Sequence, residues 1–407
     1  MAKKLTLISV LLITLMVSCK SRSLNVPRPP SGDKNTSELK VTGQSEAFVD
    51  ETQLLSLSPN GKWFFALKLE SICILDAATL AEKVCSGWKA TLDPNSIAWS
   101  PDSQRVAFSE NLPALMESDL WVFDIPSGAL SNLTNDKLEG DLATTLERAQ
   151  SGKVDINLDS LPAWSPDNKT IAFVRSIYGN TKQTILCLIS ATGGEVTKLL
   201  IADSQHSLAV WRGMRWTPDG KKILFTITIL DDETGKNGIW IVDKNGKNFK
   251  QLVKDKEGWG YVSLFDVSAK GDKALIGYPG PIARADKNPN LCFYELLDLK
   301  TGKLTPLIET STDIDQSDGQ AVFYSPTQAA FSPDGSKIVY HYNLAGEDKP
   351  TPQLVVRDVD DTRQEVLGSW SIYLGEDVGS SLFWGENDKI YLMTGPGLGI
   401  LYQLGSK

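Results

Sequence analysis

The sequence predicts an all-β protein built as a single β-propeller of about seven four-stranded antiparallel blades. Three observations predict it: a short turn phrase recurs along the chain, β-rich apolar runs flank each copy, and a spare β-rich run near the N-terminus matches a strand missing from the last repeat. An isolated four-stranded sheet leaves its faces exposed, so blades of this kind stack around a channel. Six or eight blades remain open alternatives, because two of the seven copies are degenerate.

The recurring phrase is, in most copies, an aromatic residue followed by Ser or Thr, Pro, Asp and Gly. Pro presets φ for the first corner of a tight turn, and Asp, Asn and Gly tolerate the corners that follow. Successive copies are separated by 42 to 65 residues, which indicates one repeat unit with insertions. Clear copies occupy residues 98–102, 163–167, 215–220 and 330–335, a close variant occupies 57–61, and worn copies occupy 267–271 and 384–388.

The strands of each repeat follow in order around this phrase. The apolar runs before and after it form a hairpin, with the second strand at residues 106–108, 171–173, 223–225 and 338–340 in the clear copies. A third strand comes next, as at 120–124 and 238–243. A second short turn then leads to a fourth strand, as at 130–133, 196–199 and 249–253.

The last repeat predicts how the ring closes. It supplies strands at residues 382–384, 389–393 and 400–404, and the sequence then ends without a fourth. Residues 41–49 contain β-rich runs that belong to no blade. We expect this N-terminal segment to be the missing strand, since that pairing leaves no open edge.

The Trp-Ser-Pro-Asp-Gly phrase, the Ile-Ala-Phe strand after it and a following Ile-Trp-Val-x-Asp strand resemble the propeller repeat of TolB and related periplasmic proteins. The resemblance covers residues 54–405 and implies the fold and a general tendency to bind partners. TolB also carries an α/β domain before its propeller, where we expect only a tether here. TolB's role in an envelope-spanning complex therefore does not transfer.

The N-terminus predicts a lipoprotein signal. Lys3 and Lys4 precede an apolar run at residues 5–17, which is short for a membrane span, and Met16 to Cys19 resembles a lipobox. The alternative is an ordinary secretory signal with an incidental Cys. We expect a signal peptide at 1–18, a flexible tether at 19–40 from a lipidated Cys19, and the propeller at 41–407. Lys20 favours the outer membrane, on its periplasmic side or at the cell surface.

Loop lengths predict a binding face. The long segments all fall between strands two and three or between blades, and both kinds emerge at the same end of a propeller. Neutral surface insertion is the alternative explanation. These segments are residues 110–118, 228–237, 279–290 and 343–351 within blades, and 135–160, 202–212, 309–328 and 369–379 between blades.

Cysteines and single residues provide weaker indications. Cys73 and Cys85 lie on neighbouring strands and form a possible disulfide in an oxidising compartment, with two buried thiols as the alternative. Cys187 and Cys292 lie in apolar strands and are expected in the core. The candidate ligand-binding residues near the long loops are His206, Trp211, Arg212, Trp259, Tyr261, Arg284, Asp286 and His341.

Several function classes lack support in the sequence. Two histidines far apart do not suggest a metal site, the acidic runs lack the pattern of a calcium loop, and neither a nucleophile elbow nor a P-loop is present. We expect no cofactor. The net charge is −9, and the absence of a basic cluster along the chain argues against nucleic acid as a partner.

The sequence therefore predicts a monomeric, membrane-anchored, extracytoplasmic propeller that binds a protein or peptide of the cell envelope without catalysis. A carbohydrate-binding protein or glycoside-active enzyme is the alternative, because two carboxylates suffice for glycoside hydrolysis. A structural envelope protein with no discrete ligand is a third possibility.

Overall fold

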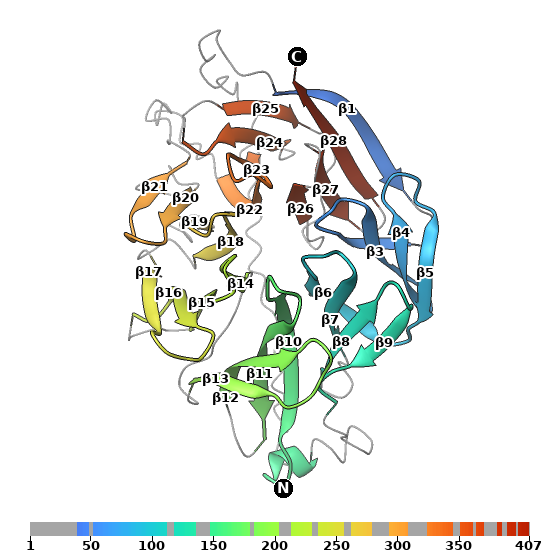
Figure 1. Cartoon of the computed structure of the whole chain (residues 1–407), viewed down its shortest axis with the longest axis vertical. Helices are drawn as coiled ribbons and strands as arrows, with labels where there is room; N and C mark the ends of the chain where they lie inside the picture. The colour runs from blue at the N-terminus through green and yellow to red at the C-terminus, as the bar shows by residue number, and fades with distance from the viewer. Residues whose placement is uncertain are drawn as a thin grey trace, which may run out of the picture.

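A computed structural model shows seven four-stranded antiparallel sheets arranged as blades around a central axis (Figure 1). The predicted propeller fold and its seven blades are confirmed. The structure describes residues 39–48, 52–111, 118–135, 147–179, 183–202, 213–229, 235–255, 262–278, 293–307, 324–344, 351–360, 364–369, 381–384, 389–395 and 398–406.

Each blade runs from an innermost strand to an outermost strand in chain order. The innermost strands of blades 1 to 7 are β2 (Gln53–Leu57), β6 (Thr91–Trp99), β10 (Ile156–Trp164), β14 (Arg215–Trp216), β18 (Ser263–Val267), β22 (Tyr324–Phe331) and β26 (Ser381–Trp384). The second strands are β3 (Trp63–Lys68), β7 (Arg105–Asn111), β11 (Thr170–Tyr178), β15 (Lys222–Ile227), β19 (Lys273–Tyr278), β23 (Lys337–Leu344) and β27 (Lys389–Gly395).

The third strands are β4 (Ser71–Asp76), β8 (Leu120–Asp124), β12 (Gln183–Ser190), β16 (Gly238–Asp243), β20 (Phe293–Asp298), β24 (Thr351–Asp358) and β28 (Leu398–Ser406). The outer strands of blades 1 to 6 are β5 (Glu82–Gly87), β9 (Ala129–Asn132), β13 (Thr197–Ala202), β17 (Lys250–Lys254), β21 (Leu304–Pro306) and β25 (Gln364–Ser369).

The outer strand of blade 7 is β1 (Leu39–Phe48), which confirms the predicted ring closure. It pairs antiparallel with β28 from Leu39 opposite Ser406 to Phe48 opposite Leu398. The first and last segments of the body are therefore held by one continuous ladder, and the third strand of blade 7 has no open edge.

The two ends of the ring differ in their connections. One end carries the tight turns between strands one and two and between strands three and four, and we call it the short-turn end. The other carries the connections between strands two and three and between blades, and we call it the long-loop end. Because β1 takes the place of a fourth strand, its first residue, Leu39, lies at the short-turn end.

The core lies between blades rather than within one. Phe65 of blade 1 packs on Phe108 of blade 2 with ring centroids 5.4 Å apart. Tyr294 of blade 5 contacts Tyr340 of blade 6 with centroids 5.1 Å apart, and both rings are buried. Alternate residues of a strand face opposite neighbours, so each blade buries apolar side chains on both of its faces.

The recurring turn phrase is held together by its own side chains. In blade 3 the Ser165 hydroxyl donates to Asp167 Oδ1 at 2.6 Å and accepts from the Thr170 amide at 2.9 Å. The same carboxylate oxygen accepts from the Lys169 amide, and these bonds lower the pKa of Asp167. The pattern recurs in blades 2, 4 and 6, so the hydroxyl and the carboxylate are required by the turn itself.

The aromatic residue of the phrase joins neighbouring blades. The Trp164 indole N–H donates to the Ala98 carbonyl at 3.0 Å, and Trp216 donates to the Ala163 carbonyl at the same distance. Each bond reaches the innermost strand of the preceding blade. Trp therefore recurs because it fills the space between blades and also satisfies a backbone acceptor there.

Candidate functional site at the long-loop end

Buried polar side chains gather at the long-loop end where blades 2 and 3 meet. Asp159 lies on β10 with a fully buried carboxylate, and Arg175 on β11 meets it with two hydrogen bonds, Nε to Oδ1 at 2.7 Å and Nη2 to Oδ2 at 2.6 Å. Burial raises the pKa of Asp159, while the guanidinium acts in the opposite direction. This fork-to-fork geometry fixes both side chains.

A second buried carboxylate, Asp119, precedes β8. Its two oxygens accept from Asn132 Nδ2 at 2.7 Å and from the Thr134 hydroxyl at 3.2 Å, and that hydroxyl in turn accepts from the Leu120 amide. Asp119 therefore ties the beginning of β8 to the end of β9 at the long-loop end.

Glu110, near the end of β7, is the third carboxylate of this group and is 8% exposed. Burial, and next the neighbouring Asp119 carboxylate, raise its pKa to about 7. The Trp121 indole lies close enough to lower this pKa, although its N–H makes no hydrogen bond of normal geometry. Glu110 is thus placed to gain or lose a proton near neutral pH.

We call Glu110, Asp119, Asp159 and Arg175 the carboxylate cluster. Backbone bonds cross the blade boundary beside it, since the Asp159 amide donates to the Ser118 carbonyl at 2.9 Å and the Ser118 hydroxyl donates to the Asp159 carbonyl. Its carboxylates are linked in order, since Asp119 raises the pKa of both Glu110 and Asp159, and Asp159 pairs with the guanidinium of Arg175. The described residues contain no group of three His, Cys, Asp or Glu side chains suited to a metal ion.

The two ends differ in the number of buried polar atoms without a partner, although the short-turn end also has one among the described residues, the indole nitrogen of Trp384 at the end of β26. At the short-turn end the hydroxyls of the recurring phrase are hydrogen bonded. At the long-loop end, four buried side-chain atoms have no hydrogen-bond partner within the described part of the chain. They are the hydroxyls of Thr226 and Thr228 and the indole nitrogens of Trp88 and Trp121.

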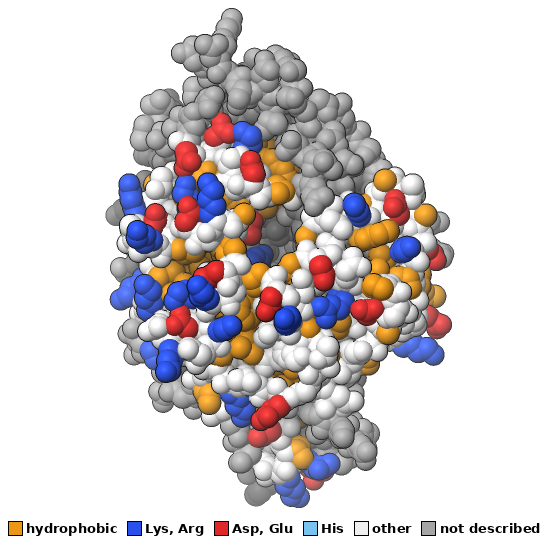
Figure 2. All heavy atoms as spheres, viewed as in Figure 1, with side chains coloured by type: hydrophobic (Ala, Val, Ile, Leu, Met, Phe, Trp, Pro, Cys, Tyr) orange, Lys and Arg blue, Asp and Glu red, His pale blue; other side chains and the backbone are white. Residues whose placement is uncertain are grey.

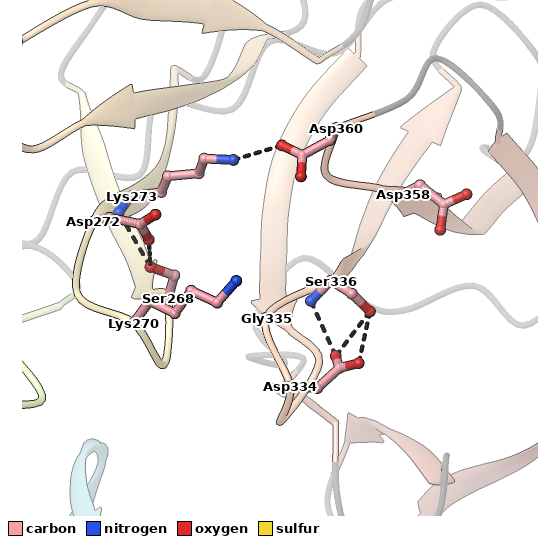
Figure 3. A pocket seen from close by; sticks show the side chains of 9 residues that line it. All are labelled: Ser268, Lys270, Asp272, Lys273, Asp334, Gly335, Ser336, Asp358 and Asp360. Atoms are coloured by element: carbon pink, nitrogen blue, oxygen red, sulfur yellow. Dashed lines mark hydrogen bonds and ion pairs between the residues drawn. The ribbon is translucent and has the colours of Figure 1, made fainter.

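An open pocket of about 360 Å³ lies at the short-turn end between blades 5 and 6 (Figure 3). Figure 3 shows Lys270 and Lys273 on one side and Asp334, Asp358 and Asp360 on the other. Lys273 Nζ reaches Asp360 Oδ1 at 2.7 Å, so an ion pair crosses the pocket. The remaining lining residues belong mostly to the recurring turns.

Most of the candidate residues predicted from the sequence lie outside the residues that the structure describes. Cys73 and Cys85 are joined by a disulfide across β4 and β5, with Cα atoms 4.1 Å apart, and Cys187 is a buried free thiol. His341 lies on β23, opposite Gln328 and Leu354. Cys19, His206, Trp211, Arg212, Trp259, Tyr261, Arg284, Asp286 and Cys292 lie outside the described residues.

The carboxylate cluster was not predicted from the sequence. One signal was available: Glu110 and Asp119 flank the same long connection, and Asp159 is an acidic residue on the strand that leads into the recurring phrase. No pattern within one repeat links these residues, because they come from two blades.

Comparison with known proteins supports the fold. No protein-family model matches the chain. It is 27% identical over 194 residues to the uncharacterized peptidase YuxL of Bacillus subtilis, a match that covers 46% of this chain and only 22% of the relative's length. The chain thus spans about a fifth of the curated relative that it matches.

Similar solved structures include an oligogalacturonate lyase in complex with manganese, with a TM-score of 0.59, 12% identity and coverage of 88% of this chain and 90% of that one. Oligogalacturonate lyase from Vibrio parahaemolyticus has a TM-score of 0.57 at 12% identity, covering 90% and 98%. TolB from Acinetobacter baumannii has a TM-score of 0.43 at 19% identity, covering 80% and 63%. At these identities the likeness concerns the fold alone.

Among the described residues, no helix has the length and apolar character needed to cross a membrane.

Proposed function

We propose that the protein is a lipid-anchored, extracytoplasmic binding module that holds a protein or peptide of the cell envelope at its long-loop end without catalysis. The observation that carries this proposal is the difference between the two ends. Hydroxyls and carboxylates of the recurring phrase are bonded to one another at the short-turn end, whereas the long-loop end contains a near-neutral carboxylate and most of the buried donors without partners among the described residues. Such groups favour recognition of a ligand that supplies the missing bonds.

Exposed apolar side chains add to the argument. Leu69 is 96% exposed at the β3–β4 turn, and Ile201 is 58% exposed at the end of β13. Both positions are at the long-loop end. A rigid ring that presents apolar and polar side chains together suits a protein surface better than a small solute.

The experiment is crosslinked capture from a membrane extract. The test variant replaces residues 136–146 with a Gly/Ser segment of equal length, which leaves β10 and the Asp159–Arg175 pair intact. The control variant carries Lys244→Glu, Lys247→Glu and Lys250→Glu at the opposite end. A partner captured by the wild type and by the control, and lost from a folded test variant, supports the proposal; equal capture by all three contradicts it.

One observation favours the carbohydrate alternative. A carboxylic acid with a pKa of about 7 beside a second carboxylate is a property of the acid residue in glycoside-active enzymes. A glycan array and a panel of glycosides, including acidic oligosaccharides, test it. Turnover that disappears in a Glu110→Gln variant that still folds, as checked by circular dichroism, would replace the binding proposal with an enzymatic one.

A further inference from the structure

The short-turn end of blades 4 and 5 carries a concentration of lysines that no property of the repeat requires. Four turns contribute, at residues 217–222, 243–250, 268–273 and 298–303, and they hold nine lysines against four aspartates. The lysines are Lys221, Lys222, Lys244, Lys247, Lys250, Lys270, Lys273, Lys300 and Lys303, which we call the lysine patch.

Hydrogen bonds and a close approach between blades show that these turns form one surface. The Lys244 amide donates to the Lys221 carbonyl at 2.9 Å, and the Leu299 amide donates to the Asp272 carbonyl at 2.8 Å. Between the blades, Gly271 lies so close to Pro218 that an added Cβ would be 2.9 Å from the ring. The linear sequence shows no basic cluster, but folding places the four turns side by side.

Most of the lysine patch is open to solvent. Seven of its lysines are exposed, and only Lys222 and Lys273 are half-buried. Ion pairs with aspartates involve Lys221, Lys222 and Lys273. Figure 2 shows basic side chains denser over the sector that Figure 1 labels β15 to β21 than over the sector of β3 to β9.

An exposed aromatic ring lies within the patch. Phe249, between Asn248 and Lys250, is 42% exposed and stacks on Trp240 with centroids 4.4 Å apart. The stacking holds the ring at the outer edge of blade 4. An apolar side chain among lysines is the combination that surface-binding segments use at the headgroup level of a bilayer.

The direction of the chain supplies an independent argument. β1 begins at Leu39 at the short-turn end, so the segment that leads to Cys19 reaches the body on the same end as the lysine patch. In Figure 1, β1 and the strands β16 and β17 lie on opposite sides of the ring. If residues 19–38 form the flexible tether that the sequence predicts, they span roughly 25 Å and keep that end near any membrane that holds the anchor.

We propose that the lysine patch docks the propeller on an anionic lipid bilayer, with the short-turn end toward the membrane and the long-loop end facing away. The tether and the patch then hold the ring at two points on one face. Lysines suit this role because the ammonium group is a point charge and binds a lipid phosphate without requiring a fixed geometry. The inference rests on the proposed lipid anchor for its tether but concerns the opposite end from the proposed partner site, and a vesicle test without the lipid anchor distinguishes the two.

The test is cosedimentation of the mature chain from residue 19, carrying Cys19→Ser, with phosphatidylcholine vesicles that contain either no anionic lipid or about 30% phosphatidylglycerol. We expect binding to the anionic vesicles only, and release when NaCl is raised to about 0.5 M. Absence of binding to anionic vesicles at low salt, or equal binding to neutral ones, overturns the proposal.

Two variants of equal charge locate the surface. Lys244→Glu, Lys247→Glu and Lys250→Glu reverse the β16–β17 turn, and these side chains take part in none of the ion pairs described above. Lys89→Glu, Lys153→Glu and Lys254→Glu reverse three exposed lysines toward the long-loop end. At about fivefold per lysine, the first variant should bind at least about a hundredfold more weakly, while the second stays close to wild type.

Circular dichroism checks that both variants are folded, and Lys→Gln changes at the same positions replace any that is not. Equal loss in both variants would show an effect of net charge alone and contradict the assigned surface. A third arm offers polygalacturonate in place of vesicles. Lysine-dependent binding to that polymer without binding to vesicles would assign the patch to an acidic polysaccharide and overturn the lipid proposal.

Discussion

At the scale of single residues, the most repeated side chains of this protein serve its turns. The hydroxyl and carboxylate of each phrase satisfy one another and the backbone, so their repetition reflects local geometry rather than chemistry on a ligand. Blade 5 illustrates this, because Lys270 replaces the usual Asp and the Ser268 hydroxyl donates instead to Asp272 at 2.8 Å. The turn keeps its bond, and the replaced position becomes part of the lysine patch.

Ser165→Ala should lower the free energy of unfolding by about 1–3 kcal/mol, because it leaves the Thr170 amide without its acceptor. Urea denaturation measures the change. Ser131→Ala, at an exposed position of β9, is the matched control and should stay within about 0.5 kcal/mol of wild type. Equal effects of the two changes would contradict the structural role of the phrase.

Glu110 should make stability depend on pH near neutrality. Its folded pKa of about 7 lies above the ordinary 4.5, so the folded state binds the proton more tightly than the unfolded chain. The contribution of Glu110 to the free energy of unfolding is therefore greatest below pH 4.5. It falls as the pH rises toward 7 and no longer changes above that pH.

Glu110→Gln should remove this dependence, which amounts to about 2 kcal/mol after allowance for solvent screening. Urea denaturation of wild type and variant at several pH values between 4.5 and 8 measures the difference. Parallel curves for the two proteins would show that Glu110 does not titrate in this range.

At the scale of elements, the β4–β5 hairpin and the β1–β28 pair hold the body where repeats alone would not. The disulfide spans 12 residues of blade 1 at neighbouring outer strands. The β1–β28 ladder joins the N-terminal strand of the ring to its C-terminal strand. Both features join the third and fourth strands of a blade. These strands lie at the outer side of the ring, where fewer neighbouring strands cover the sheet.

Replacing both Cys73 and Cys85 by Ser should cost about 2–3 kcal/mol of stability, since the closed loop is short. The same loss is expected when the wild type is treated with a reductant. Thermal unfolding with and without dithiothreitol measures both, and the double variant should not respond to the reductant. A wild type that is also insensitive would indicate that the two thiols are not bonded in the isolated protein.

Deletion of residues 39–48 should abolish the monomeric fold, because β28 would become an open edge. Size-exclusion chromatography and thermal unfolding measure the outcome, with aggregation or loss of the cooperative transition expected. Deletion of residues 19–38, which precede β1, is the control and should leave both measurements unchanged. A stable monomer without β1 would contradict its role in ring closure.

At the scale of the whole molecule, the ring separates two surfaces with different chemistry. The long-loop end holds carboxylates and unsatisfied donors, and the short-turn end holds the lysine patch. The inter-blade core makes the body rigid, so a change at one end is not expected to alter the other.

A variant that combines the 136–146 replacement with the three lysine reversals should lose partner capture and vesicle binding together. Each single variant should lose only one of them, since the surfaces lie at opposite ends of the ring. Capture and cosedimentation of all four proteins measure this. A lysine reversal that also reduces partner capture would show that the two surfaces act as one site.

The sequence by itself determined the fold class, the seven repeats, the closing strand and the division into a short-turn and a long-loop end. These features depend on local chemistry, namely Pro, Asp and Gly at turn corners and apolar alternation in strands. Local patterns of this kind can be recognised directly in the amino-acid sequence.

Only the tertiary structure brought Glu110, Asp119 and the Asp159–Arg175 pair together, and only it gathered lysines from four separate turns. Both groupings arise because consecutive blades stack, so residues far apart in the chain become neighbours across a blade boundary. No periodicity within a repeat encodes which polar side chains will meet there, because that depends on register and twist between two sheets.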